Sequence, residues 1–98
     1  MKTAYLYKNQ GTCSSHIKLV VEDGRLLTAE YYGGCNGNTK GIAALVKGMP
    51  IDEVITRLEG IRCGFKPTSC PDQMAKALTL IKNGESTPSL KIITEEEA

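Results

Sequence analysis

The pair Asp23-Gly24 lies between two stretches in which apolar and polar residues alternate. An Asp-Gly pair accepts the positive φ angles of a two-residue turn, so residues 16–22 and 25–32 are predicted to pair as antiparallel strands. Two tyrosines at alternate positions predict a further strand over residues 3–8. The first third of the chain is therefore expected to fold as a three-stranded antiparallel sheet.

The rest of the chain has the period of helices. Apolar residues recur three and four positions apart in three stretches, and a glycine ends each stretch. These apolar residues are Ile42, Leu45, Val46 and Met49, then Ile51, Val54, Ile55 and Leu58, then Met74, Leu78 and Ile81. Asn38 or Thr39 is expected to cap the first helix, and Pro50 to open the second. Ser69 is expected to cap the third, with Asp72 returning a hydrogen bond in a capping box.

Length and composition limit the chain to one hydrophobic core. The chain has 98 residues, of which 41% are hydrophobic and 23% charged. Strands followed by helices are typical of the α+β class. We expect a single domain over residues 1–84 and a polar tail over residues 85–98. Within the tail, Leu90, Ile92 and Ile93 allow one short fourth strand at the edge of the sheet.

The charge balance argues against binding to nucleic acid or to an anionic membrane. Twelve Lys and Arg oppose eleven Asp and Glu, which gives a net charge of +1. Aromatic residues, at 5%, offer few surfaces on which bases could stack. No stretch approaches the roughly 20 apolar residues of a membrane span or has the pattern of a signal peptide. We therefore expect a cytoplasmic protein.

Four cysteines, Cys13, Cys35, Cys63 and Cys70, are the main chemical signal. Thiols stay reduced in the cytoplasm, which favours a metal or redox site over disulfides. Cys70 opens a helix, where free backbone N–H groups favour a thiolate, and Cys35 lies in a glycine-rich loop. The spacing contains no C-x-x-C pair. A four-thiolate site for zinc or an iron–sulfur cluster, ordinary reduced thiols and disulfide chemistry therefore all remain open.

His16 is the one histidine of the sequence. Strand alternation predicts it on the face opposite Ile17, Leu19 and Val21. We expect an exposed or supporting histidine here, because a Cys-His nucleophilic pair needs a third orienting group that the sequence does not single out. His16 is kept as a lesser candidate for a ligand or base.

Residues 68–72 have the sequence TSCPD, from which the TSCPD-domain family takes its name, and segments 34–37 and 60–63 fit that family's other cysteine segments. From about Cys13 to Ile81, the chain resembles the short stand-alone members of the family. The same domain also occurs at the carboxyl end of adenosylcobalamin-dependent ribonucleotide reductases. The resemblance implies that all four cysteines bind metal and that the chain is associated with ribonucleotide reduction.

A fainter resemblance, in the order of cysteines, glycine loop and helices, is to the NifU/IscU iron–sulfur scaffolds. Three cysteines of those proteins hold a cluster or zinc, and they match the first, second and fourth cysteines here. The scaffold's aspartate after its first cysteine is Ser15 in this chain, and the histidine before its last cysteine is Ser69. The resemblance implies a NifU/IscU-like fold, while the missing aspartate implies a closed site with Cys63 as a fourth ligand.

The resemblances together imply a small metal-binding accessory or interaction domain. Zinc held by four cysteines is the first expectation, with a ribonucleotide reductase as the protein partner. The chain cannot be a complete reductase, because 98 residues do not hold a cofactor-bearing barrel. Two alternatives stay open: Cys63 and Cys70 pass electrons as a dithiol in ribonucleoside-diphosphate reduction, or the chain is an iron–sulfur cluster scaffold or carrier. The oligomeric state is left open.

Overall fold

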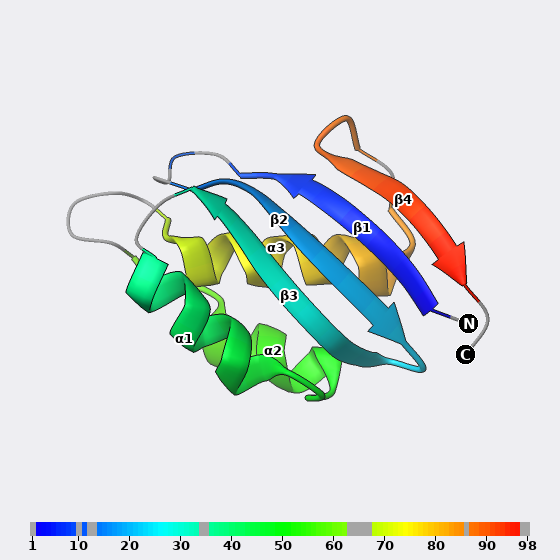
Figure 1. Ribbon diagram of the computed structural model, residues 1–98, viewed down its shortest axis with the longest axis horizontal. Coiled ribbons are helices and arrows are strands. Elements are labelled where there is room, and N and C mark those ends of the chain that lie inside the picture. The colour runs from blue at the N-terminus through cyan, green and yellow to red at the C-terminus, as the bar shows by residue number, and fades with distance from the viewer. Residues whose placement is uncertain are drawn as a thin grey trace.

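The described residues form an antiparallel sheet of four strands with three helices on one face, so the predicted α+β class is confirmed (Figure 1). This computed structural model describes residues 2–9, 11, 14–33, 36–62, 68–85 and 87–96. The strands, in spatial order, are β3 (Arg25–Gly33), β2 (Ser14–Glu22), β1 (Lys2–Lys8) and β4 (Leu90–Glu96). The helices are α1 (Asn36–Val46), α2 (Ile51–Leu58) and α3 (Cys70–Asn83).

The fourth strand is a full member of the sheet. β4 has seven residues and pairs antiparallel with β1, with Leu90 opposite Tyr7 and Ile92 opposite Tyr5. Leu90 packs against the core, whereas Ile92 and Ile93 are exposed at the edge. The sheet of the described residues therefore has four strands, with the expected edge strand as the fourth.

The hairpin between β2 and β3 has the turn that the sequence predicts. Asp23 and Gly24 have φ angles of 52° and 75°, the left-handed values of a two-residue hairpin turn. Backbone hydrogen bonds tie the connection between α1 and α2 to this hairpin. The Leu26 N–H donates to the Met49 carbonyl and the Ile51 N–H to the Gly24 carbonyl, each at 2.9 Å. Backbone groups thus hold this end of the sheet.

At its other end, β2 begins with a β-bulge. Pairing passes from Ser14 opposite Gly33 to His16 opposite Tyr32, so Ser15 is an extra residue on β2. A bulge changes the face to which a side chain points. Ser14 is buried against α3, whereas Ser15 is exposed.

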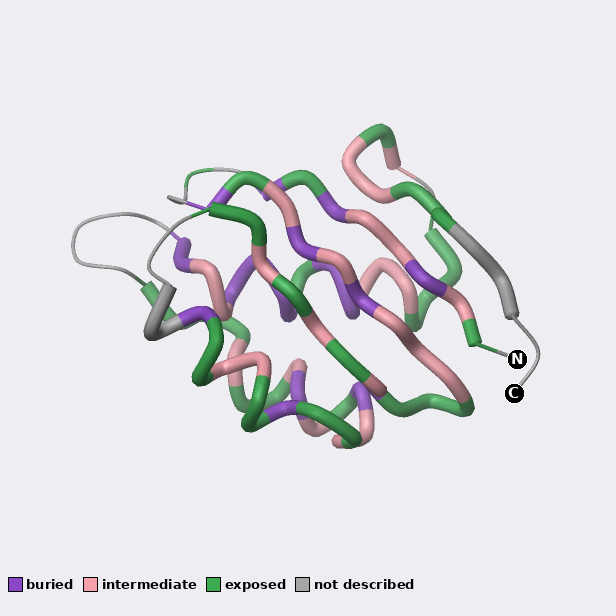
Figure 2. Tube along the Cα trace, in the orientation of Figure 1, coloured by how far each residue is buried: buried purple, intermediate pink, exposed green. Residues whose placement is uncertain are grey.

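The core lies between the sheet and the three helices, and Figure 2 shows the buried positions along β2 and α3. α3 contributes more of the buried core side chains than α1 or α2. The buried core consists of Tyr7, Ile17, Leu19, Leu26, Val46, Ile51, Val54, Met74, Ala77 and Leu78. Burying one large aliphatic side chain stabilises the fold by about 1.5–3 kcal/mol. This packing fixes the first turn of α3 relative to β2.

Helix α1 differs from its prediction. It begins at Asn36, so the expected cap at Asn38 or Thr39 is wrong, because both residues lie within the helix. Packing of α1 against β3 outweighs the low helix propensity of its glycines and asparagines. Leu45, expected in the buried stripe, is 79% exposed, because the buried side runs through Thr39 and Val46. No helix of the described ranges is long and apolar enough to cross a membrane.

Candidate metal centre

Helix α3 begins at Cys70, and Ser69 caps it as predicted. The Ser69 Oγ accepts a hydrogen bond from the Asp72 N–H at 3.2 Å and donates one to the Ile61 carbonyl at 2.6 Å. Pro71 lies in the first turn, where a missing N–H leaves no helical bond unmade. The cap therefore also holds the chain that follows α2 against the start of α3.

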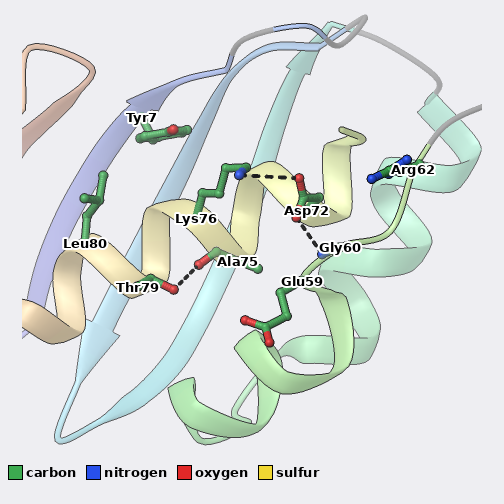
Figure 3. Close-up of a pocket in the computed structure, with 9 residues that line it drawn as sticks. All are labelled: Tyr7, Glu59, Gly60, Arg62, Asp72, Ala75, Lys76, Thr79 and Leu80. Atoms are coloured by element: carbon green, nitrogen blue, oxygen red, sulfur yellow. Dashed lines mark hydrogen bonds and ion pairs between the residues drawn. The ribbon is translucent and has the colours of Figure 1, made fainter. Parts of the chain in front are cut away.

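The carboxylate of Asp72 joins the same segments from the inside. The expected return bond to the cap is wrong: the carboxylate accepts a hydrogen bond from the Gly60 N–H at 2.7 Å (Figure 3). It accepts another from the Thr68 hydroxyl. Asp72 is buried, with the Lys76 Nζ 3.9 Å from its carboxylate. Burial, and to a lesser extent the charge of Asp72, raise the pKa of Tyr7 above its ordinary value. Because its donors replace water, this buried carboxylate stabilises the junction.

The side chain of Cys70 lies against the buried start of β2. Its Sγ is 3.0 Å from the Ser14 Oγ, within hydrogen-bond distance. The Ser14 Oγ accepts a hydrogen bond from the Asn9 Nδ2 at 2.7 Å. Cys70 is half-buried, and its thiol is free. A free, accessible thiol at the start of a helix can act as a metal ligand or as a nucleophile.

Asn9 leaves one polar atom without a partner beside this pair. The residue is 8% exposed, and its buried Oδ1 accepts no hydrogen bond from the described part of the chain. A buried carbonyl oxygen without a donor costs about 1–3 kcal/mol. Such atoms in folded proteins often mark the place of a bound water or ion. With respect to the described residues, the Asn9 Oδ1 therefore remains available to a water or an ion.

Tyr31 of β3 holds the first turn of α3 through its backbone. The Tyr31 hydroxyl donates a hydrogen bond to the Cys70 carbonyl at 2.7 Å. Burial, and to a lesser extent the charge of a Cys70 thiolate, raise the pKa of Tyr31, so the hydroxyl keeps its proton and remains a donor. The backbone of Cys70 is thus held by β3, while its side chain contacts β2.

The chain between β1 and β2 also approaches the start of α3. Gly11 has a φ angle of 73°, and a Cβ at this position would lie 3.2 Å from the Thr68 Cγ2. The left-handed backbone favours glycine here, and any larger residue would also press against the Thr68 side chain.

Cys70 is the predicted site cysteine that falls within the described residues. Cys13, Cys35 and Cys63 lie outside them, and so does any direct contact they make. Described residues near each of them are found at the Cys70 end of the sheet. Ser14, next to Cys13, contacts Cys70. Gly33, two positions before Cys35, pairs with Ser14. Ile61, two positions before Cys63, accepts a hydrogen bond from the Ser69 hydroxyl through its carbonyl. Within the described ranges, no group of three or more His, Cys, Asp or Glu residues could hold a metal ion.

His16 lies on the open face of the sheet, as alternation predicts. Its Nδ1 is 3.0 Å from the Ser15 Oγ. It lines a shallow surface hollow together with Leu6, Lys18, Tyr32 and Ile93. The structure therefore does not bring His16 to the Cys70 side of the sheet.

Three residues around Cys70 are not apparent from the sequence: Asn9, Ser14 and Tyr31. They belong to no motif, and the bulge that buries Ser14 has no sequence signature. The one sign available is that Ser14 directly follows Cys13.

A separate cleft of about 720 Å³ opens between β1, the end of α2 and the outer side of α3 (Figure 3). Two acidic and two basic residues line it, namely Glu59, Asp72, Arg62 and Lys76. Cys70 is not among the described residues of this lining. The mixed charge selects no class of ligand, so the surroundings of Cys70 are the better candidate site.

Comparison with known proteins gives one match. A family model described as the TSCPD domain matches residues 2–82, which contain all four cysteines and the start of α3. Comparison with curated proteins and with solved structures finds no match. The chain belongs to the TSCPD-domain family.

Proposed function

We propose that this chain is a small accessory or interaction domain in which Cys13, Cys35, Cys63 and Cys70 bind one zinc ion. The main support is that described segments next to these cysteines converge on the start of α3. In this proposal the chain works in the cytoplasm, where thiols stay reduced and available to a metal.

The contact between Ser14 and Cys70 carries the proposal. Ser14 directly follows Cys13, and its Oγ lies 3.0 Å from the Cys70 Sγ. Consecutive Cα atoms are about 3.8 Å apart. In a tetrahedral site with Zn–S bonds of about 2.3 Å, two ligand sulfurs are also about 3.8 Å apart. The position of Ser14 is therefore compatible with one ion shared by Cys13 and Cys70.

Similar distances support Cys35 and Cys63 as further ligands of the proposed ion. Gly33, two positions before Cys35, pairs with the first residue of β2. The carbonyl of Ile61, two positions before Cys63, accepts a hydrogen bond from the cap of α3 at 2.6 Å. Two residues of extended chain span up to about 7 Å. These short separations are compatible with both cysteines sharing an ion with Cys70.

The polar groups nearby favour a site of thiolates alone. The Asp72 carboxylate is occupied by Gly60 and Thr68, and His16 lies on the opposite face. Zinc in a closed four-thiolate site has a structural role, because the ion is not redox-active. Bound here, it would join the start of α3 to the ends of β2 and β3.

The test is the metal content of the full chain purified without oxygen, measured with its absorption spectrum. We expect one zinc per chain and no visible absorption, because Zn²⁺ has a filled d shell. Cys70→Ser should lower the zinc content, whereas Ser69→Thr, which keeps a capping hydroxyl beside it, should not. Visible absorption would instead identify an iron–sulfur cluster, and a protein without metal would overturn the proposal.

The proposed partner is a ribonucleotide reductase. This proposal is supported by the family, because the same domain occurs at the carboxyl end of adenosylcobalamin-dependent reductases. The test is calorimetric titration of the zinc-loaded chain with the reductase of the same organism, with chain treated with chelator as the control. Binding of the zinc-loaded form alone is expected, and no binding of either form would exclude this partner.

A second candidate function is electron transfer by Cys63 and Cys70, which the free, half-buried thiol of Cys70 favours. The two thiols would form one disulfide and reduce one disulfide of the reductase, with transfer of two electrons and two protons. Mass spectrometry after mixing reduced chain with oxidised reductase tests it. A Cys63–Cys70 disulfide would support this function, and unchanged thiols would favour the zinc site.

A further inference from the structure

Resting on the proposed zinc site, we infer that Ser14 is a positioning residue for the sulfur of Cys70. Its hydroxyl donates a hydrogen bond to the Cys70 Sγ, and the amide of Asn9 sets the direction of that bond. Ser14 is not itself a ligand: it holds a ligand in place from the neighbouring strand.

In the proposed site Cys70 is a thiolate with no hydrogen, so the Ser14 hydroxyl is the donor and the sulfur the acceptor. A serine hydroxyl has one hydrogen and two lone pairs. The Asn9 Nδ2 donates to the Ser14 Oγ at 2.7 Å, which uses one lone pair and directs the hydroxyl hydrogen away from Asn9. The Cys70 Sγ lies 3.0 Å from the same oxygen, so the sulfur is placed to accept that hydrogen.

Burial and backbone geometry keep this arrangement in place. Ser14 is 2% exposed and Asn9 is 8% exposed, so water does not compete for their bonds. The bulge at Ser15 directs Ser14 toward α3, and the Asn9 N–H donates to the Ser15 carbonyl at 2.9 Å. The donor is therefore held by β2 and by Asn9, the residue that follows β1.

This hydrogen bond matters most when the sulfur binds a metal. A coordinated thiolate is negatively charged, and hydrogen bonds to charged acceptors are about twice as strong as those between neutral groups. Loss of a residue that orients a ligand typically costs about 10–100-fold in metal affinity. Removing the Ser14 hydroxyl should therefore weaken zinc binding while all four cysteines remain.

Zinc transfer from the full chain to a chromophoric chelator tests this. Ser14→Ala should lose zinc about 10-fold more readily than the native chain. Ser14→Thr keeps the hydroxyl and should restore retention. Ser15→Ala removes the neighbouring exposed hydroxyl and should match the native chain. Equal transfer from the native chain and both alanine variants would overturn the inference.

Substitution with cobalt(II) gives a readout that a general loss of stability would not move. A sulfur that loses a hydrogen bond gives a charge-transfer band at lower energy, so Ser14→Ala should shift the band and Ser15→Ala should not. Asn9→Ala leaves Ser14 in place and should give a smaller shift in the same direction. An unshifted band in both Ser14→Ala and Asn9→Ala would contradict the inference.

The metal-free chain separates this inference from the proposed function. If the native chain binds neither zinc nor cobalt, the proposed function fails, and the S–H stretch of Cys70, assigned with Cys70→Ser, decides the inference alone. With Ser14 as the donor, this band should not rise in frequency in Ser14→Ala. A rise would show that the Cys70 thiol donates to Ser14, which is the opposite direction.

Discussion

The two ends of the sheet are held by different kinds of bonds. At the hairpin end, the backbone groups of Gly24 and Leu26 bond to the connection between α1 and α2. At the opposite end, the Ser14 and Tyr31 side chains join β2 and β3 to Cys70 at the start of α3. The hairpin end therefore depends mainly on backbone hydrogen bonds, to which the Arg25 side chain adds one to the Gly48 carbonyl. The Cys70 end depends on hydrogen bonds of side chains.

The Cys70 end also carries two groups that a bound metal or water could contact. Its buried Asn9 Oδ1 has no donor within the described structure, and its half-buried thiol is free. An unpaired buried acceptor lowers stability unless another group satisfies it. If zinc binds as proposed, it should stabilise the Cys70 end and leave the hairpin end unchanged.

Removal of metal should produce the largest change. A ligand that binds the folded chain alone stabilises it by about 4 kcal/mol when its free concentration is about 1000-fold above Kd. In a domain of this size, that corresponds to a fall in Tm of more than about 10 °C on chelation. Hydrogen exchange should accelerate at the start of α3 and not at the Asp23-Gly24 hairpin.

Cys70→Ser is the matching variant for this experiment. Its Tm should be low and should no longer respond to chelator, because the metal has lost a ligand. An unchanged melt in both experiments, or equal acceleration at both ends of the sheet, would contradict the comparison.

Asp72→Ala should give the next largest effect. It removes the acceptor of the buried hydrogen bonds from Gly60 and Thr68, which should lower the free energy of unfolding by about 3 kcal/mol. Asp52→Ala is the matched control, because the Asp52 side chain is exposed and pairs with Lys82, which limits its cost to about 1 kcal/mol or less. Urea unfolding of both variants measures the difference, and equal costs would count against the role of Asp72.

Substitution of two glycines with similar backbone angles allows a direct comparison of the two ends of the sheet. Gly24 has a φ angle of 75° with open space around it, and Gly11 has one of 73° with Thr68 close by. Each substitution by alanine should cost about 1–2 kcal/mol for the left-handed backbone. Gly11→Ala should cost more, because its Cβ meets Thr68, and should also weaken zinc retention. Zinc retention that falls equally in both variants would contradict a site confined to one end.

Alkaline pH should have the smallest effect. The pKa values of Tyr7 and Tyr31 are raised in the folded chain, so above pH 10.0 the folded state keeps protons that the unfolded state loses. The free energy of unfolding should therefore fall as the pH rises above this value, by at most about 1.4 kcal/mol per pH unit for each tyrosine. Urea unfolding on both sides of pH 10.0 measures the fall, and Tyr31→Phe should make it shallower. A stability that rises with pH in this range would contradict the role of burial.

Local rules predicted most of the fold. The Asp23-Gly24 turn and the Ser69 cap are confirmed, because turn and cap chemistry act over a few residues. The early start of α1 and the exposure of Leu45 escaped prediction, because the contact of α1 with β3 sets both. A local sequence pattern carries no information about such long-range packing.

The candidate site was predictable only in part. The sequence indicates Cys70 at the start of a helix, and the structure confirms that position. It does not indicate that a bulge directs Ser14 to the sulfur, or that Asp72 accepts from Gly60 rather than from the cap. Both depend on residues brought together by the fold. Binding of one metal by Cys13, Cys35 and Cys63 with Cys70 stays a prediction.

Timed alkylation of the zinc-loaded chain, followed by mass spectrometry, tests most directly whether the four cysteines hold one zinc ion. Metal-bound thiolates are protected, so Cys13, Cys35, Cys63 and Cys70 should all resist labelling. All four should react together once a chelator removes one zinc per chain. Fast and selective labelling of Cys70 with the zinc retained would contradict the site and identify Cys70 as a redox thiol.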